Sequence, residues 1–132
     1  MKVFHYINFG LIFLFLIGIC ILEEVYVSNS LTKVQNDCFQ IEKELERNED
    51  VLLSMNMTLL VDNLEYHWDK NESDLCYMVN HKSIQEIGQE IAKMKSYIAN
   101  DDIDAFKVSI EAIKYYCHSY LHFMGANLHN IL

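Results

Sequence analysis

The stretch that decides the fold is the apolar run VFHYINFGLIFLFLIGICIL, residues 3–22. It contains no Asp, Glu, Lys or Arg side chain. As a helix it would rise about 30 Å, which is the thickness of the hydrocarbon core of a bilayer. A helix satisfies its own backbone hydrogen bonds, as lipid requires. The run therefore predicts a transmembrane helix, with residues 1–24 acting as a signal anchor.

The charges on either side of the run predict its orientation. Lys2 and the amino terminus precede it, and Glu23 and Glu24 follow it. Positive charge tends to stay in the cytoplasm. We therefore expect a single-pass protein of the cell membrane, with residues 25–132 forming an extracytoplasmic domain.

Two other interpretations of this segment, a cleaved signal peptide and a lipoprotein signal, are less well supported. A cleaved signal peptide needs small residues just before the cut, but Ser28 and Ser30 lie beyond two glutamates and do not form an A-x-A-like site. A lipoprotein acylated at Cys20 would need a small residue at position 19, where the chain has Ile19. We therefore expect an uncleaved anchor.

Composition limits the class of the remaining domain. The chain has 132 residues, no proline and only four glycines, which favours helices over turn-rich β structure. The net charge is −9, and no cluster of Lys and Arg exceeds two residues, so the charge pattern of a nucleic-acid-binding protein is absent. Cys38, Cys76 and Cys117 are widely spaced and odd in number, so we expect mainly buried thiols rather than a disulfide scaffold.

Four apolar stripes with steps of three and four residues predict amphipathic helices. No glycine or proline lies between Gly18 and Gly88, so the membrane helix can run directly into the first stripe. Asn71 interrupts the second stripe, where the helix is expected to weaken or bend. The stripes are Leu31, Val34, Cys38, Ile41 and Leu45; Leu53, Met57, Leu60, Leu64, Trp68, Leu75 and Met78; Ile84, Ile87, Ile91, Met94 and Ile98; and Phe106, Ile110, Ile113, Cys117, Tyr120 and Met124.

Turn and cap signals divide the stripes into separate helices. Residues 48–50 and 100–102 read NED and NDD, and each can end one helix and cap the next. Ser83 followed by Glu86 matches a capping box and predicts the start of the third stripe's helix. The prediction is an all-α protein, an N-terminal transmembrane helix followed by an antiparallel bundle of about four helices arranged as two helical hairpins.

Several features together resemble a known family. They are the N-terminal apolar segment, Trp68 late in the second helix, His81, KMKSYIANDDIDAF at 93–106 and LHNIL at 128–132. This set resembles the small bacterial family catalogued as domain of unknown function 4363, found mainly in Firmicutes. The resemblance implies a membrane-tethered helical protein. It implies no activity and no catalytic residues.

The histidines near the end of the chain are the candidate site. On a helical projection His118, His122 and His129 point away from the apolar stripe, on the same side as Glu111. His118 and His122 are about 6 Å apart along the axis and could share a metal ion, although further ligands would have to come from elsewhere. We expect a solvated histidine face and keep a metal site at His118 and His122 as the alternative.

The functional expectation follows from what the sequence contains. It has no glycine-rich phosphate loop, nucleophile elbow or CxxC pair, and we expect no cofactor and no enzymatic activity. The prediction is a structural or protein-interaction module at the cell surface. A partner helix or a second copy would dock on stripe 31–45 or 106–124, if the bundle leaves either exposed. The alternative is a ligand- or metal-sensing domain that uses the His118/His122 face.

Overall fold

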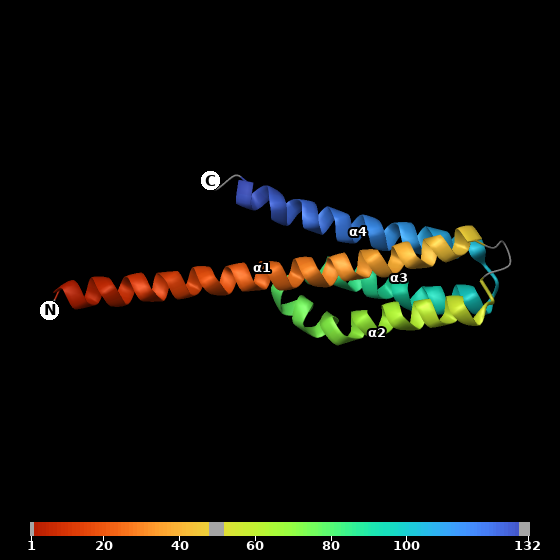
Figure 1. Ribbon diagram of the computed structural model, residues 1–132, viewed down its shortest axis with the longest axis horizontal. Coiled ribbons are helices and arrows are strands. Elements are labelled where there is room, and N and C mark those ends of the chain that lie inside the picture. The colour runs from red at the N-terminus through yellow and green to blue at the C-terminus, as the bar shows by residue number, and fades with distance from the viewer. Residues whose placement is uncertain (1, 48–51, 130–132) are drawn as a thin grey trace.

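The computed structural model is an all-α antiparallel bundle with one long projecting helix (Figure 1). It describes residues 2–47 and 52–129, with side chains over 6–47 and 52–122, and these ranges contain no strand. The helices are α1 (Lys2–Arg47), α2 (Met55–Met78), α3 (His81–Ala99) and α4 (Ile103–His129). Each helix packs against two neighbours, in the order α1, α2, α3, α4 and back to α1. The predicted fold class is confirmed.

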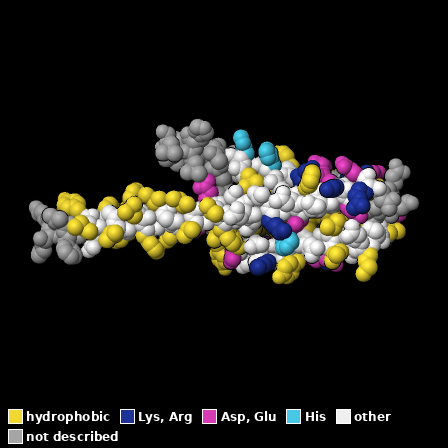
Figure 2. Space-filling model, in the orientation of Figure 1, with side chains coloured by type: hydrophobic (Ala, Val, Ile, Leu, Met, Phe, Trp, Pro, Cys, Tyr) yellow, Lys and Arg dark blue, Asp and Glu magenta, His cyan; other side chains and the backbone are white. Residues whose placement is uncertain are grey.

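Helix α1 is a single element of 46 residues that belongs to the bundle only in its second half. Its first half projects beyond the other helices and carries apolar side chains along its length (Figure 2). α1 is long and apolar enough to cross a membrane, and only 6% of its apolar window is buried, unlike the core helix of a soluble protein. The prediction that this segment continues directly into the first stripe is confirmed.

The core of the bundle is made by the four predicted stripes. Their buried members are Leu31, Val34, Cys38, Ile41, Met57, Leu64, Trp68, Leu75, Ile84, Ile87, Ile91, Met94, Phe106, Ile110, Ile113 and Cys117. Leu45 and Tyr120 pack at its edge, and the side chain of Met124 lies outside the described residues. Over the described residues, stripes 31–45 and 106–124 are covered by the protein's own helices. The condition for a partner to dock on them is therefore not met.

The second stripe was predicted wrongly at both ends. The Leu53 side chain is 64% exposed and Met78 is also exposed, whereas Leu52 and Val79 are buried. Leu52 and Leu53 precede the helix, so the 3.6-residue period does not govern which of them faces inward. Val61 was missed because α2 packs against both α1 and α3, which widens its buried face beyond a narrow stripe.

Helix α3 starts earlier than the capping box predicted. The Asn80 side chain accepts a hydrogen bond from the Lys82 backbone N–H at 3.0 Å, so Asn80 is the N-cap. Ser83 therefore lies inside the first turn, and the predicted box of Ser83 with Glu86 is wrong. Asparagine is as good a cap as serine, and the earlier of the two sites is used.

The starts of α2 and α4 also have side-chain caps. Ser54 Oγ accepts a hydrogen bond from the Met57 N–H at 3.1 Å at the start of α2. Asp102 Oδ1 accepts one from the Ala105 N–H at 3.0 Å at the start of α4, which confirms an aspartate cap in the second turn signal. The first turn signal, residues 48–50, lies outside the described residues.

Helix α2 curves toward α1 in its C-terminal half, where a bend was predicted (Figure 1). Asn71 Nδ2 donates a hydrogen bond to the His67 carbonyl oxygen at 2.7 Å. A side chain that bonds to the preceding turn competes with the helical hydrogen bonds and favours curvature. Asn71 also separates the buried side chains of Trp68 and Leu75, so the core contact of α2 is interrupted at this point.

Candidate functional site

The predicted histidine pair lies on the outer face of α4. The His118 and His122 side chains are both exposed, their rings are nearly parallel at 14°, and their centroids are 6.4 Å apart. Cys117 is buried in the core instead. The solvated face predicted for these two histidines is confirmed, while the side chain of His129 lies outside the described residues.

A metal site at this pair stays a prediction. Among the described side chains no group of three or more His, Cys, Asp or Glu residues converges as a metal site would require. Glu111, predicted on the same side, instead accepts a hydrogen bond from Lys114 Nζ at 3.1 Å. A metal held by His118 and His122 would need ligands from outside these residues.

The structure shows a second set of polar groups that the sequence analysis did not find. Each pair of neighbouring helices is joined by at least one polar contact between side chains. These contacts are Asp37 with His67, Lys95 with Glu65 and Asp62, Ser109 with Glu90, and Lys114 with Glu42. The contacts of Asp37, Glu90 and Glu42 are partly buried, and hydrogen bonds at the edge of a core favour one rotation of the helices against one another. The contacts of Lys95 are exposed and contribute less.

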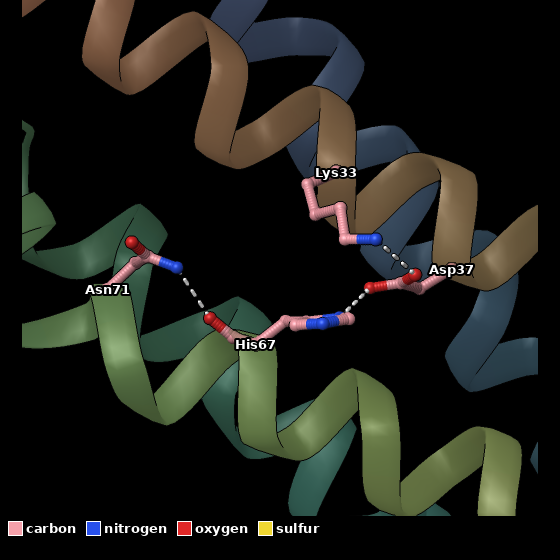
Figure 3. Close-up of polar contacts among 4 residues, drawn as sticks. All are labelled: Lys33, Asp37, His67 and Asn71. Carbon is pink, nitrogen blue, oxygen red and sulfur yellow. Dashed lines mark hydrogen bonds and ion pairs between the residues drawn. The ribbon is translucent and has the colours of Figure 1, made fainter.

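The contact between α1 and α2 is the most extended of these (Figure 3). The His67 Nδ1 atom lies 2.6 Å from Asp37 Oδ2, and Lys33 Nζ lies 3.6 Å from the other oxygen of that carboxylate. One turn further along α2, Asn71 Oδ1 accepts a hydrogen bond from the Tyr26 hydroxyl at 2.9 Å. A carboxylate that orients a histidine also occurs in hydrolytic sites. Within the described residues no serine or cysteine is hydrogen-bonded to this ring, and the contact joins α1 to α2.

The contact between α3 and α4 changes the acidity of Glu90. Its carboxylate accepts hydrogen bonds from Ser109 Oγ and from Lys93 Nζ, both at 2.7 Å. Burial alone would raise the pKa of Glu90, but these two hydrogen bonds outweigh it and lower the pKa below its ordinary value of 4.5. Ser109 is buried, so the carboxylate satisfies a hydroxyl that would otherwise lack water.

Comparison with known proteins identifies the family. The family described as a domain of unknown function (DUF4363) matches residues 21–131. The chain belongs to the DUF4363 family. No curated protein and no solved structure matches the chain. The matched range covers the bundle and leaves most of the apolar segment outside it, and the family assigns no activity to the contacts described above.

The cysteines of this DUF4363 protein are free thiols. Burial raises the pKa of Cys117 to about 12 and raises the pKa of Cys38 well above its usual range. The thiolate is the reactive form of cysteine, so these two side chains are inert at neutral pH. The prediction that they act as small buried apolar groups is confirmed. Cys76 is half-buried, and Cys20 is exposed on the projecting part of α1.

A close contact between helices in the DUF4363 bundle involves its single tryptophan. The Trp68 side chain is 2% exposed, and its buried Nε1 atom has no hydrogen-bond partner among the described residues. A Cβ atom at Gly88 would lie only 2.9 Å from that nitrogen. Trp68 is thus the core residue that the sequence predicted, and Gly88 on α3 provides the space for its indole ring.

Proposed function

We propose that this DUF4363 protein is a single-pass membrane protein whose bundle lies outside the cytoplasm and acts as a non-enzymatic structural or protein-interaction module. The observation that carries this is the continuity of α1. Its apolar side chains are exposed over most of residues 6–22, and the same helix enters the core at Val27. Apolar surface of this extent is unfavourable in water, whereas lipid would cover it.

The charge distribution supports the proposed orientation. Lys2 precedes the apolar segment, and Glu23 and Glu24 follow it on the bundle side. This asymmetry favours a cytoplasmic N-terminus.

An exposed apolar face on α2 supports the interaction role. Met55, Leu59 and Tyr66 are exposed large side chains, and Met55 and Leu59 line a shallow groove with Thr58 and Asp62. Steps of four and seven residues place the three side chains on one face of the helix. Exposed apolar side chains on one helix face are typical of protein-interaction sites, and Asp62 adds a charge between Leu59 and Tyr66 on this face.

The orientation can be tested by labelling introduced cysteines on intact cells. The background carries C20S and C76S, because the remaining cysteines, Cys38 and Cys117, are buried. In this background M55C should react with a membrane-impermeant maleimide on intact cells. K2C should react only after the cells are permeabilised. The reverse pattern, or a mature protein that lacks the apolar segment, would contradict the proposal.

The interaction role can be tested by photocrosslinking in the membrane. A photoreactive amino acid at Tyr66 should yield a discrete higher-mass product. The same group at Gln89, an exposed position on α3, should not. Equal products at both positions, or none at either, would argue against a binding surface on α2.

The exposed His118/His122 pair supports a second candidate, a ligand- or metal-sensing domain. Two parallel histidine rings on one helix face can supply two of the four ligands that Zn²⁺ prefers. Zinc should then raise the melting temperature of the full-length protein, and the variant H118A/H122A should lose that gain. An equal response of both proteins to zinc would exclude the pair.

A further inference from the structure

One end of the bundle lies directly beside the apolar segment of α1. The turn between α2 and α3 and the last turns of α4 lie at this end, and the opposite end carries the turn between α3 and α4 (Figure 1). Met78, the last residue of α2, lines a groove with Ile19, Leu22 and Val25 of α1. The end of α2 is therefore level with the end of the apolar run, and no spacer separates the bundle from it.

Helix α4 reaches the same end. Its Tyr120 side chain packs against the edge of the core, close to the backbone of Asn80 in the turn between α2 and α3. The backbone of α4 continues beyond Tyr120 to His129, in the same direction as the apolar half of α1 but diverging from it (Figure 1). The final part of α4 thus extends past the end of α2.

On its α4 side this end of the bundle carries fewer charged residues than the opposite end, although Glu23 of α1 lines the groove at Met78. From Tyr115 to Leu132 the sequence contains no Asp, Glu, Lys or Arg, whereas residues 42–50 contain seven. The Tyr77 side chain is 89% exposed and Met78 is also exposed, although each is large and partly or wholly apolar. Lys82, near the start of α3, adds an exposed cation that can reach a lipid phosphate.

We propose that this end of the bundle, made by Tyr77, Met78 and the uncharged final part of α4 from Tyr115, lies in the headgroup layer of the bilayer that α1 spans. The inference rests on the proposed membrane span. With the hydrocarbon core around residues 3–22, Met78 lies at its edge, and the headgroup layer is only about 5–7 Å thick on each side. Tyrosine is favoured in this layer because its ring is apolar and its hydroxyl is polar. The bundle is therefore seated on the membrane rather than held away from it.

Fluorescence quenching by lipid-bound nitroxides tests this arrangement. Full-length protein in the C20S/C76S background is labelled with an environment-sensitive fluorophore and reconstituted into phosphatidylcholine vesicles that contain a headgroup nitroxide lipid. Y77C is compared with M55C, which is equally exposed on the same helix but about 33 Å further from the membrane along the axis. H122C is compared with V108C on α4, about 21 Å apart. Both comparisons use exposed side chains.

Labels at 77 and 122 should lose fluorescence in the presence of the nitroxide lipid, and labels at 55 and 108 should not. A label at I12C, tested with an acyl-chain nitroxide, reports the span itself. If position 12 is quenched but 77 and 122 are not, the contact with the headgroup layer is refuted and the anchor stands. If position 12 is not quenched, both the anchor and the contact are refuted. Equal quenching at all four bundle positions would indicate that the bundle lies flat on the membrane, which also refutes the proposal.

Discussion

At the scale of single residues, the contact between Trp68 and Gly88 shows how one small side chain sets the approach of two helices. Trp68 brings the largest side chain of the core to the α2–α3 interface, and its Nε1 atom lies where a Cβ atom of residue 88 would be. Glu72 Oε1 lies near the same point, at 3.2 Å from that Cβ position. Any larger residue at position 88 must displace the indole ring.

The variant G88A should therefore be less stable, by about 1–3 kcal/mol, because overpacking forces side chains from their preferred positions. Glycine to alanine in a helix normally stabilises by about 0.5–1 kcal/mol, so the sign of the change is informative. Denaturant unfolding in detergent micelles, followed by the fluorescence of Trp68, measures it. Q89A, at the next and exposed position, is the control and should change stability little. An increase in stability on G88A would contradict the packing described.

Glu90 shows how a partly buried carboxylate links stability to pH. Its pKa is lower in the folded protein than its ordinary value of 4.5. The ionised carboxylate therefore stabilises the fold above this value, and the contribution is lost as the pH falls through the folded-state pKa. The stabilisation comes from the charge-assisted hydrogen bonds with Lys93 and Ser109.

The variant E90Q should accordingly lower the free energy of unfolding by about 1–2 kcal/mol near neutral pH. The difference from the unmodified protein should shrink as the pH falls below 4.5 and through the lower folded-state pKa, where Glu90 itself becomes protonated in the folded protein. Denaturant unfolding over a range of pH measures both quantities. E86Q, which changes a more exposed glutamate on the same helix, should show a smaller difference. A difference that does not vary with pH would contradict the role given to the charge of Glu90.

At the scale of helices, the apolar stripes could be predicted from the sequence, whereas the polar contacts between helices could not. The stripes follow from the 3.6-residue period, which is a property of one helix, so Leu31 to Ile41 could be assigned from sequence. The contact of Asp37 with His67 depends on the rotation of two helices against each other, and no local pattern carries this information. The N-cap of α3 was predicted wrongly for a related reason, because Asn80 and Ser83 are both acceptable N-caps and the local sequence does not distinguish them.

The histidine face could be predicted only in part. The orientation of His118 and His122 could be read from the projection of one helix, and the structure confirms it. Whether other ligands approach them depends on residues outside α4, which sequence reasoning could not place. The close approach of Trp68 to Gly88 was missed for the same reason, although a lone glycine within a helical pattern is a recognisable signal for such a contact.

The contact between α1 and α2 can be measured by a double-mutant cycle of D37N and H67Q. The coupling energy should be about 0.5–1.5 kcal/mol, because the two side chains are partly buried and hydrogen-bonded. The cycle of K33M with D37N is the matched comparison. It should give a smaller value, since Lys33 is exposed and 3.6 Å from the carboxylate. Equal coupling in the two cycles would show that His67 has no special part in joining the helices.

At the scale of the whole molecule, the continuity of α1 determines how the bundle and the apolar segment are connected. The helix has no break between the exposed segment and Val27, where the core begins. The groove that Met78 lines with residues of α1 lies across this junction, so the end of α2 lies beside α1 at the point where it leaves the bundle. We therefore expect a rigid connection between the apolar segment and the bundle.

Hydrogen exchange in detergent micelles tests this rigidity. Backbone amides of residues 23–30 should exchange as slowly as those of residues 31–41, because both lie within one uninterrupted helix. The first-turn amides of α2, which lack partners inside the helix, provide the fast reference. A fast-exchanging segment between residues 23 and 30 would instead reveal a hinge between the anchor and the bundle.

The absence of a break in α1 also constrains how this protein can be rebuilt. One residue inserted between Glu24 and Val25 would turn the apolar segment by about 100° relative to the core, and would lift the bundle by about 1.5 Å. Seven inserted residues would return the apolar segment to within about 20° of its original angle relative to the core, but would move the bundle about 10 Å further from the apolar segment along the helix axis. A foreign anchor joined to this bundle must therefore match the original in helical phase as well as in length.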